Sequence, residues 1–408
     1  MYILGVKVDN LNKKEVLAKM DEFLNSEEQY YITTPNPEIV LRAQKDEDYQ
    51  NILNYADLAI ADGVGLILAS IFFFGWRGRF KQRIRGVDLV EWLIETKENS
   101  RVDFFLLGGK FSIAALAAEK LKRKFSKLQI VGAESGPKIN QQGRPQNEQE
   151  EIINNQIIEK INQTKPQILL VAFGAPKQEK WIHNYLAQIP SVKIAIGIGG
   201  TFDFLAGKIK RAPQFWQETG LEWLWRLIQE PKRWRRIYNA VIVFPIKCIL
   251  WRWRRLIFYR PNACAFIYQG EKILVVERVD DPGHWQFPQG GLRKGEKIEQ
   301  GILREMEEEL GADQFRIKKI VLKAHKYIWD KHQWSKKFIT EKRKTFYPYK
   351  GQKQTLVILE FMGSDSDIKL DRKEFTRWQW VTQDKLIKTL HPYRHTIGQK
   401  ALEEFKKL

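Results

Sequence analysis

The chain has 408 residues, of which 43% are hydrophobic. This length predicts two or three domains, and this composition excludes a wholly disordered chain. With only 2 Cys and 27 Gly, a disulfide-stapled or collagen-like protein is also excluded. The net charge of +19 favours anionic partners, which are nucleic acid, phosphorylated substrates or an anionic membrane surface.

Short apolar runs alternate with helical patterns in the first half of the chain. We expect strands at 30–33, 103–107, 168–172 and 193–196, and helices that include 112–125 and 177–187. This alternation predicts an α/β domain over residues 1–206, with a doubly wound, mostly parallel sheet. Several of the strands are followed by glycine, which is typical of the carboxyl edge where such folds bind ligands.

The segment 207–257 concentrates the positive charge. Between Leu205 and Arg260 there are 13 Lys or Arg, 3 Asp or Glu, and 6 of the 14 Trp. Its apolar run 241–250, like the run 66–76, is shorter than the roughly 20 residues that a membrane span requires. Alternating Trp and Arg on both sides of an apolar run favour a helix that lies among lipid headgroups. We therefore interpret 207–257 as a basic, membrane-facing helical appendage; the alternative is a basic helix packed on its own domain.

From about residue 258 the pattern changes. The apolar runs 263–267 and 273–276 are separated by Gln269 and Gly270, which predicts a hairpin. The C-terminal domain is expected to cover residues 258–408.

Three carboxylates in this C-terminal domain have helical spacing. Glu305, Glu308 and Glu309 stand at i, i+3 and i+4, on one face of a predicted helix. Without a counter-charge they would repel each other, so the pattern favours a hard divalent cation that also binds phosphate oxygens. A solvated acidic helix face is the alternative, but it does not explain the glycines, Glu296 and Arg304 at their spacings.

Residues 290–312, GGLRKGEKIEQGILREMEEELGA, resemble the Nudix box of pyrophosphohydrolases. The resemblance covers about 259–405 and is to the branch that includes bacterial RNA pyrophosphohydrolases and diadenosine polyphosphate hydrolases. It implies an α/β/α sandwich with a mixed sheet. It also implies Mg²⁺ or Mn²⁺ held by Glu305, Glu308, Glu309 and Glu374, all of them catalytic, and substrate phosphate bound by Arg278, with Arg394 as a looser match.

The implied Nudix reaction is attack of a metal-activated water on a phosphoanhydride. Its substrate is either a nucleotide, such as a dinucleoside polyphosphate, or the 5′-phosphate end of an RNA. The basic segment Lys331–Lys350 suits RNA, and a solvated loop is the alternative.

A series of short motifs marks the N-terminal part of the chain. In order they are TTPNPE (33–38), ADGVG (61–65), GG (108–109), AFGAPKQE (172–179), GIGGTFD (197–203), KRAP (210–213) and GLEWLWR with EPKRWRR (220–236). Together they resemble the TagA/WecG/CpsF glycosyltransferases, over about residues 2–240. That family transfers N-acetylmannosamine or a related N-acetylhexosamine from a UDP-sugar to a polyprenyl-diphosphate-linked acceptor, in the synthesis of cell-surface polysaccharide.

This second resemblance, with the chemistry it implies, assigns roles to residues. The acceptor hydroxyl must lose a proton, and we expect Asp62 to be the base, with Thr34 beside it. The one Asp-x-Asp of this region, Asp46-Glu47-Asp48, is interpreted as a solvated helix start and not as a metal motif. We therefore expect no metal and assign the charge of the leaving UDP to arginines. The arginines are Arg85, Arg226, Arg233 and Arg236. Further substrate contacts are expected from Asn36, Gly109, Gln178 and Asp203.

The sequence therefore predicts a bifunctional fusion of a glycosyltransferase and a Nudix hydrolase. We expect it in the cytoplasm, peripherally bound to the inner face of the cytoplasmic membrane, with its oligomeric state left open. The alternative is an RNA-associated Nudix pyrophosphohydrolase whose N-terminal part is a non-catalytic binding module. Flotation with anionic liposomes, with and without RNase, distinguishes the two.

Overall fold

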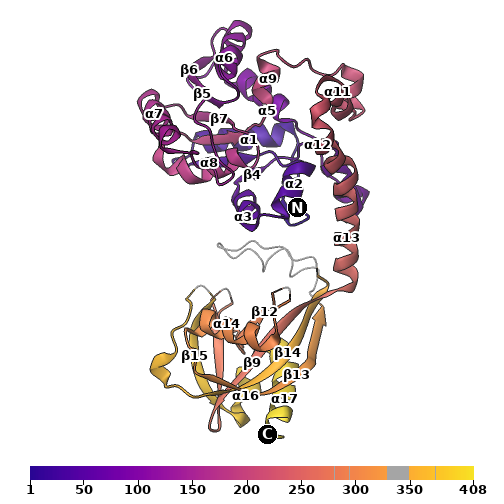
Figure 1. Cartoon of the computed structure of the whole chain (residues 1–408), viewed down its shortest axis with the longest axis vertical. Helices are drawn as coiled ribbons and strands as arrows, with labels where there is room; N and C mark the ends of the chain where they lie inside the picture. Colours follow the sequence, from indigo (N-terminus) through magenta and orange to yellow (C-terminus); the bar gives the residue numbers. More distant parts are fainter. Residues whose placement is uncertain (280, 294, 329–348, 373) are drawn as a thin grey trace. The chain divides into compact units, whose positions relative to one another are not determined.

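The computed structural model describes residues 1–279, 281–293, 295–328, 349–372 and 374–408 (Figure 1). Almost all of the basic segment Lys331–Lys350 lies outside these residues. The chain forms two compact units, the first over Met1–Arg252 and the second beginning at Trp253. Each unit is described by itself.

A six-stranded sheet forms the centre of the first unit, and every neighbouring pair of its strands is parallel. In spatial order the strands are β4 (Leu58–Ala59), β3 (Tyr30–Thr33), β8 (Ile194–Gly197), β7 (Ile168–Ala172), β5 (Asp103–Gly108) and β6 (Gln129–Glu134). A small antiparallel pair, β1 (Tyr2–Ile3) and β2 (Val6–Lys7), precedes this sheet. The predicted parallel sheet is confirmed.

Helices cover both faces of this sheet (Figure 1). Because side chains alternate along a strand, Phe104 and Leu106 pack on one face while Phe105 and Leu107 pack on the other. The first face is covered by α1 (Lys13–Leu24), α5 (Gly86–Lys97), α6 (Ile113–Lys124) and α9 (Thr201–Leu205). The second face is covered chiefly by α7 (Glu148–Thr164) and α8 (Lys177–Tyr185). The unit is therefore doubly wound, as expected.

A third apolar core lies beside the sheet. It joins the β1–β2 pair to α2 (Pro37–Ala43), α3 (Glu47–Tyr55) and α4 (Val64–Phe74). Phe244 and Cys248 of the basic segment are buried in this core. The basic segment is thereby anchored on the α/β domain.

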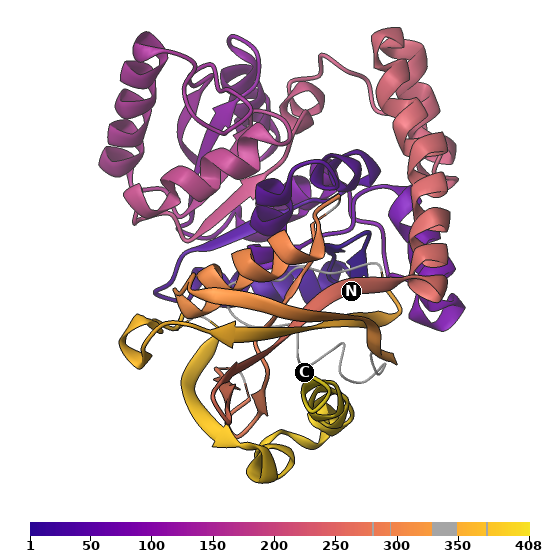
Figure 2. The ribbon, with the colours of Figure 1, turned by 60° about the horizontal axis from the view of Figure 1, so that its bottom comes forward.

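The basic segment is helical. It contains α10 (Gln214–Glu218), α11 (Glu222–Gln229), α12 (Trp234–Tyr238), a π-helical turn η4 (Asn239–Val243) and α13 (Phe244–Ile257). From α12 to α13 the helix runs on without a break (Figures 1 and 2). Ile246 and Leu250 of α13 are about half exposed. Among the described residues, no helix combines the length and the apolar character that crossing a membrane requires.

The second unit is built on a mixed sheet. Its strands are β9 (Tyr259–Gln269), β10 (Lys272–Arg278), β11 (Trp285–Gln286), β12 (Gln289–Gly291), β13 (Phe315–Ile328), β14 (Gly351–Phe361) and β15 (Phe375–Thr382). β9 and β14 are parallel, and the other pairs are antiparallel, including the predicted hairpin β9–β10. The helix α14 (Ile298–Leu310) packs on one face, and α16 (Gln383–Thr389) with α17 (His395–Phe405) packs on the other. This is the expected α/β/α sandwich.

Candidate active sites

A cavity of about 840 Å³ opens at the carboxyl edge of the parallel sheet in the first unit. Residues that follow β3, β4, β7 and β8 line it, together with residues of α11, α12 and α13. Eight of the residues predicted from the sequence lie in its wall: Thr34, Asn36, Asp62, Arg85, Gln178, Arg226, Arg233 and Arg236. The topology thus gathers residues that are distant in sequence around one cavity.

Asp62 lies where the chain leaves β4 and enters α4. Its backbone N–H donates to the carbonyl of Pro35 (2.9 Å), which fixes it beside the end of β3. The next residue, Gly63, has φ +98°, a conformation that glycine adopts without strain. Burial, assisted by Glu222, raises the pKa of Asp62 to about 7, although Arg83, Arg226 and Arg85 oppose the shift. A carboxylate with a pKa near neutrality is well matched to removing a proton from a hydroxyl.

Three arginines of the appendage gather in the wall of the same cavity. Arg226 and Arg233 share Glu230, at 3.3 and 2.7 Å, and Arg236 pairs with Glu38 at 2.6 Å. Burial lowers the pKa of Arg226, and the charges of Arg233 and Arg236 lower it further. Guanidinium groups that repel each other in this way form a suitable site for a diphosphate.

Arg85 is held more tightly by protein groups than the sequence suggests. Its guanidinium pairs with Asp88 and with Glu222 (3.0 Å), and it donates to the side chain of Gln217 (2.8 Å). Since Glu222 begins α11, these contacts tie the appendage to α5. The structure therefore gives Arg85 an anchoring role that its predicted role as a phosphate ligand did not include.

Three polar residues of the cavity wall also organise the backbone. The Asn36 side chain accepts from the N–H of Ile39 (3.0 Å) and caps α2. The Gln178 side-chain oxygen accepts from the N–H groups of Gly174 (3.1 Å) and Gly199 (2.9 Å), and so joins the loops after β7 and β8. The Thr34 hydroxyl donates to the carbonyl of Gly197 (3.1 Å). These side chains hold the glycine-rich edge of the sheet in place.

The second unit brings together the predicted carboxylates. Glu305, Glu308 and Glu309 lie on α14, and Glu374 precedes β15. Burial raises the pKa of Glu309 well above its usual value, and the carboxylates of Glu374 and Glu305 raise it further. Burial also raises the pKa of Glu305, despite its contact with Arg304. Mutually repelling carboxylates that are partly withdrawn from water fit a divalent cation.

The neighbouring turn is shaped to receive these carboxylates. A Cβ atom on Gly290 would lie only 1.9 Å from the Glu305 carboxyl carbon, so a larger residue there would displace the Glu305 side chain from its position. The backbone N–H of Gln289 donates to Glu309 (3.2 Å). Arg304 links Glu296 (2.8 Å) to Glu305 (2.8 Å) across the turn. Together these contacts explain why the glycines, Glu296 and Arg304 keep their spacing.

Comparisons with known proteins assign a family to each of the two parts of the chain. The model of the "Glycosyl transferase WecG/TagA/CpsF family" matches residues 1–257, more than half of the chain. The chain belongs to the WecG/TagA/CpsF glycosyltransferase family. The model of the NUDIX domain matches residues 258–403, so this family member is fused to a Nudix domain. The chain is therefore an enzyme with a glycosyltransferase domain and a Nudix hydrolase domain, and Nudix domains use a divalent metal.

Two relatives resemble the WecG/TagA/CpsF part of the chain. Both are named N-acetylglucosaminyldiphosphoundecaprenol N-acetyl-β-D-mannosaminyltransferase. The protein of Bacillus spizizenii is 32% identical over 218 residues, which are 53% of this chain and 78% of the relative. That of Bacillus subtilis is 30% identical over 232 residues, 55% of this chain and 84% of the relative.

Solved structures resemble the Nudix part. An Ap4A hydrolase of C. elegans has 16% identity and a TM-score of 0.27, and covers 36% of this chain and 99% of its own. A NUDIX hydrolase from Nitrosomonas europaea has 24% identity and a TM-score of 0.26, and covers 36% of this chain and 89% of its own.

Two predicted contacts of the WecG/TagA/CpsF domain, Gly109 and Asp203, do not line the cavity. Gly109 follows β5, and a Cβ atom there would meet Ile113 and Phe202, so it serves close packing. Conversely, Arg83 lines the cavity and acts on the charge of Asp62, yet the sequence did not single it out. Its signal was a second arginine two residues before Arg85, which is weak evidence in so basic a chain.

In the Nudix domain, the charges of the two predicted phosphate contacts both act on His284. Arg278 ends β10, and Arg394 precedes α17 and donates to the side chain of Gln286 (2.8 Å). Burial lowers the pKa of His284 to about 4, and the charges of Arg394 and Arg278 contribute to this shift.

Proposed function

We propose that the first unit transfers N-acetylmannosamine, or a related N-acetylhexosamine, from a UDP-sugar to a polyprenyl-diphosphate-linked acceptor. The observation that carries this proposal is the single cavity that holds both Asp62 and the arginine cluster Arg226, Arg233 and Arg236. The relatives' names, which specify an N-acetylglucosaminyl-diphospho-lipid acceptor and an N-acetylmannosaminyl group, support this choice of substrates.

The proposed transfer divides the work between these groups. Asp62 accepts the proton of the acceptor hydroxyl as its oxygen bonds to the anomeric carbon of the donor sugar. The bond from that carbon to the diphosphate oxygen breaks, and its electron pair leaves with UDP. The arginine cluster stabilises the charge that develops on this oxygen. With three guanidinium groups in place, this domain needs no metal.

For the second unit we propose Mg²⁺- or Mn²⁺-dependent hydrolysis of a phosphoanhydride in a nucleotide or at an RNA 5′ end. Glu305, Glu308, Glu309 and Glu374 would hold the cation, which when bound neutralises phosphate oxygens and favours ionisation of the attacking water. Arg278 and Arg394 bind substrate phosphate. Arg304 orients Glu305 and, through Glu296, holds the turn that begins at Gly290.

We propose that the enzyme acts at the inner face of the cytoplasmic membrane, to which the appendage binds peripherally. Trp234, Ile246 and Leu250 expose much of their apolar surface along α12 and α13. Arginines accompany them, which suits anionic headgroups.

The direct test is sugar transfer by the full chain. A panel of UDP-sugars is incubated with a polyprenyl-diphosphate-N-acetylglucosamine analogue, and UDP release and product mass are recorded. We expect transfer with UDP-N-acetylmannosamine, and a loss of about 10²-fold or more in Asp62→Asn, as for removal of a general base. Transfer that persists at the normal rate in Asp62→Asn, or no transfer from any UDP-sugar, would contradict the proposal.

A further inference from the structure

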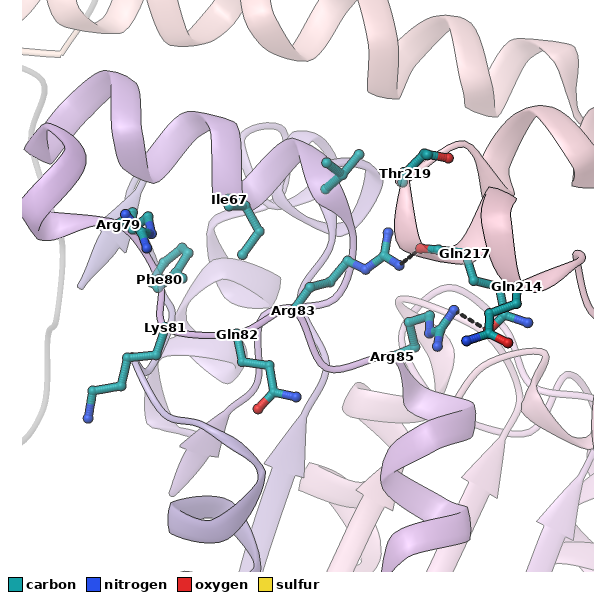
Figure 3. Close-up of a pocket in the computed structure, with 12 residues that line it drawn as sticks. Ile67, Arg79, Phe80, Lys81, Gln82, Arg83, Arg85, Gln214, Gln217 and Thr219 are labelled. Atoms are coloured by element: carbon teal, nitrogen blue, oxygen red, sulfur yellow. Dashed lines mark hydrogen bonds between the residues drawn. The ribbon is translucent and has the colours of Figure 1, made fainter.

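A second cavity, of about 820 Å³, adjoins the first one in the α/β unit. Figure 3 shows residues that line this second cavity. The two cavities share Val64, Arg83, Arg85, Thr219 and Gly220 in their walls. The second cavity alone is lined by Arg79, Lys81 and Gln82, from the segment between α4 and α5. A ligand bound there is separated from the Asp62 cavity only by this shared wall.

The second cavity is strongly cationic. The lining that the described residues form contains four basic side chains, Arg79, Lys81, Arg83 and Arg85, and no acidic one. Lys81 pairs with Glu15, and Arg85 with Asp88 and Glu222. Within the described part of the chain, Arg79 and Arg83 form no ion pair; Arg83 donates only to the backbone carbonyl of Gln217 (2.6 Å; Figure 3). Two guanidinium groups thus keep their charge available for an anion.

The cavity lies next to an exposed apolar helix. α4 leaves Leu68, Phe72 and Phe74 substantially exposed, and Trp76 directly follows it with 68% exposure. The Arg79 guanidinium lies over the Trp76 ring at 4.3 Å. Arginine beside exposed tryptophan and phenylalanine is the composition that proteins present to the headgroup layer of a membrane.

Each of the two substrates of the proposed transfer carries a diphosphate group of its own. The donor carries one, which the arginine cluster of the appendage is proposed to hold. The acceptor carries another, between its sugar and its lipid, and its sugar hydroxyl must reach Asp62. A second cationic cavity that shares a wall with the Asp62 cavity and opens beside an apolar helix meets these conditions.

We infer that this second cavity binds the diphosphate of the lipid-linked acceptor, through Arg79 and Arg83 with Lys81 at its rim, while α4 contacts the first part of the lipid chain. This inference rests on the proposed transferase function and adds an acceptor subsite to it. Arg83, in the shared wall, lies between the two substrates.

The test uses the full chain with the double substitution Arg79→Ala, Lys81→Ala, because neither residue lines the Asp62 cavity. The matched control is Lys122→Ala, Arg123→Ala on the exposed surface of α6. Removing charge-assisted hydrogen bonds to a diphosphate should raise the KM for a short-chain prenyl-diphosphate-N-acetylglucosamine about tenfold or more. The KM for the UDP-sugar and the rate at saturating acceptor should stay within about twofold, as in the control.

Direct binding separates the two proposals. Calorimetry of the short-chain acceptor with wild type and the double variant needs no catalysis, so it reports on the subsite even if no sugar is transferred. Equal affinity for the two proteins would overturn the inference and leave the transferase proposal standing. Inorganic diphosphate carries the same charged group as the acceptor, so it should also bind the double variant more weakly than the wild type. Phosphatidylglycerol vesicles carry no diphosphate: if they lose as much affinity in the double variant as the acceptor does, the cavity is a lipid headgroup site and the assignment to the acceptor is wrong.

Discussion

Asp62 combines two properties that a sequence cannot report. It follows a short buried strand, and burial raises its pKa to about 7. The motif ADGVG identified the residue, but its pKa depends on Glu222 and on three arginines, of which Arg226 is more than a hundred residues away in the chain. At this scale the sequence predicts which residues line the cavity better than it predicts their pKa values.

The pH dependence of transfer follows from this pKa. Asp62 must be unprotonated to accept a proton, so kcat/KM for transfer should fall about tenfold per pH unit below about 7 and level off above it. The measurement is a pH–rate profile of the full chain between pH 5 and 9. A profile that stays flat down to pH 5 would mean that no group of this pKa acts as the base.

Asp62 should also make the folded state less stable at neutral pH. An unfolded aspartate has a pKa of about 3.9, so between about pH 4 and 7 the folded chain binds the extra proton. The free energy of unfolding therefore falls as pH rises through this window, and the loss is complete above about 7. Asp62→Asn removes this loss, so its unfolding temperature should exceed that of wild type at pH 8 and approach it near pH 4. An equal difference in unfolding temperature between Asp62→Asn and wild type at pH 8 and pH 4 would contradict the predicted loss of stability with rising pH.

Glu309 should couple metal binding to the stability of the Nudix domain. A cation that binds these carboxylates only in the folded state of the domain raises its unfolding temperature by mass action. We expect Mg²⁺ or Mn²⁺ to stabilise the wild type, and Glu309→Gln to lose most of this effect. Glu299→Gln, which changes an exposed residue in the first turn of α14, is the control and should respond like the wild type.

At the scale of elements, local pattern predicted most of the fold. Four of the six parallel strands, β3, β5, β7 and β8, were evident because each is a short apolar run that a glycine or a helix follows. The edge strands β4 and β6 were not predicted, because β4 has only two residues and the apolar residues of β6 are interrupted by Gly132. The segment between α4 and α5 was not evident, because its basic residues show neither a helical nor a strand period. The contacts of its arginines depend on the folded chain, in which this segment packs against α10 and α11. Arg83 and Arg85 both donate hydrogen bonds to Gln217 of α10.

The appendage should contribute arginines to catalysis at defined positions. Arg233 and Arg236 line the Asp62 cavity, whereas Arg235 lies between them in sequence, is exposed and packs on Trp234. Arg236→Ala should lower the rate of transfer at saturating substrates about tenfold or more, because charge on the leaving diphosphate loses a partner. Arg235→Ala is the matched control. Similar losses in both variants would indicate general damage to the appendage.

The apolar side of α13 should determine membrane binding. We expect the full chain to float with phosphatidylglycerol liposomes, and RNase should not release it. Ile246→Glu should reduce flotation, whereas Ile152→Glu, an equally exposed isoleucine on α7, should not. Release by RNase would favour the alternative, in which the basic segment contacts RNA.

At the scale of the whole molecule, the chain joins a glycosyltransferase domain to a Nudix domain, and both are proposed to act on substrates with phosphoanhydride bonds. One domain is proposed to neutralise the phosphate charge with guanidinium groups, and the other with a cation held by glutamates. The residues proposed for these two sites could be selected from the sequence because each set belongs to a compact or ordered series of motifs. The cavity proposed to bind the acceptor could not be predicted, since its walls come from three separate segments and its cations stand in no motif.

The most direct measurement assays one variant of each site for both activities in the full chain. Asp62→Asn and Glu309→Gln are each assayed for sugar transfer and for Mg²⁺-dependent release of phosphate or pyrophosphate from nucleoside and dinucleoside polyphosphates. We predict that Asp62→Asn abolishes transfer and leaves hydrolysis at the wild-type rate, and that Glu309→Gln does the reverse. The account would be contradicted if one substitution abolished both activities without unfolding the chain, because the two sites would then not be independent. It would also be contradicted if Asp62→Asn left transfer intact.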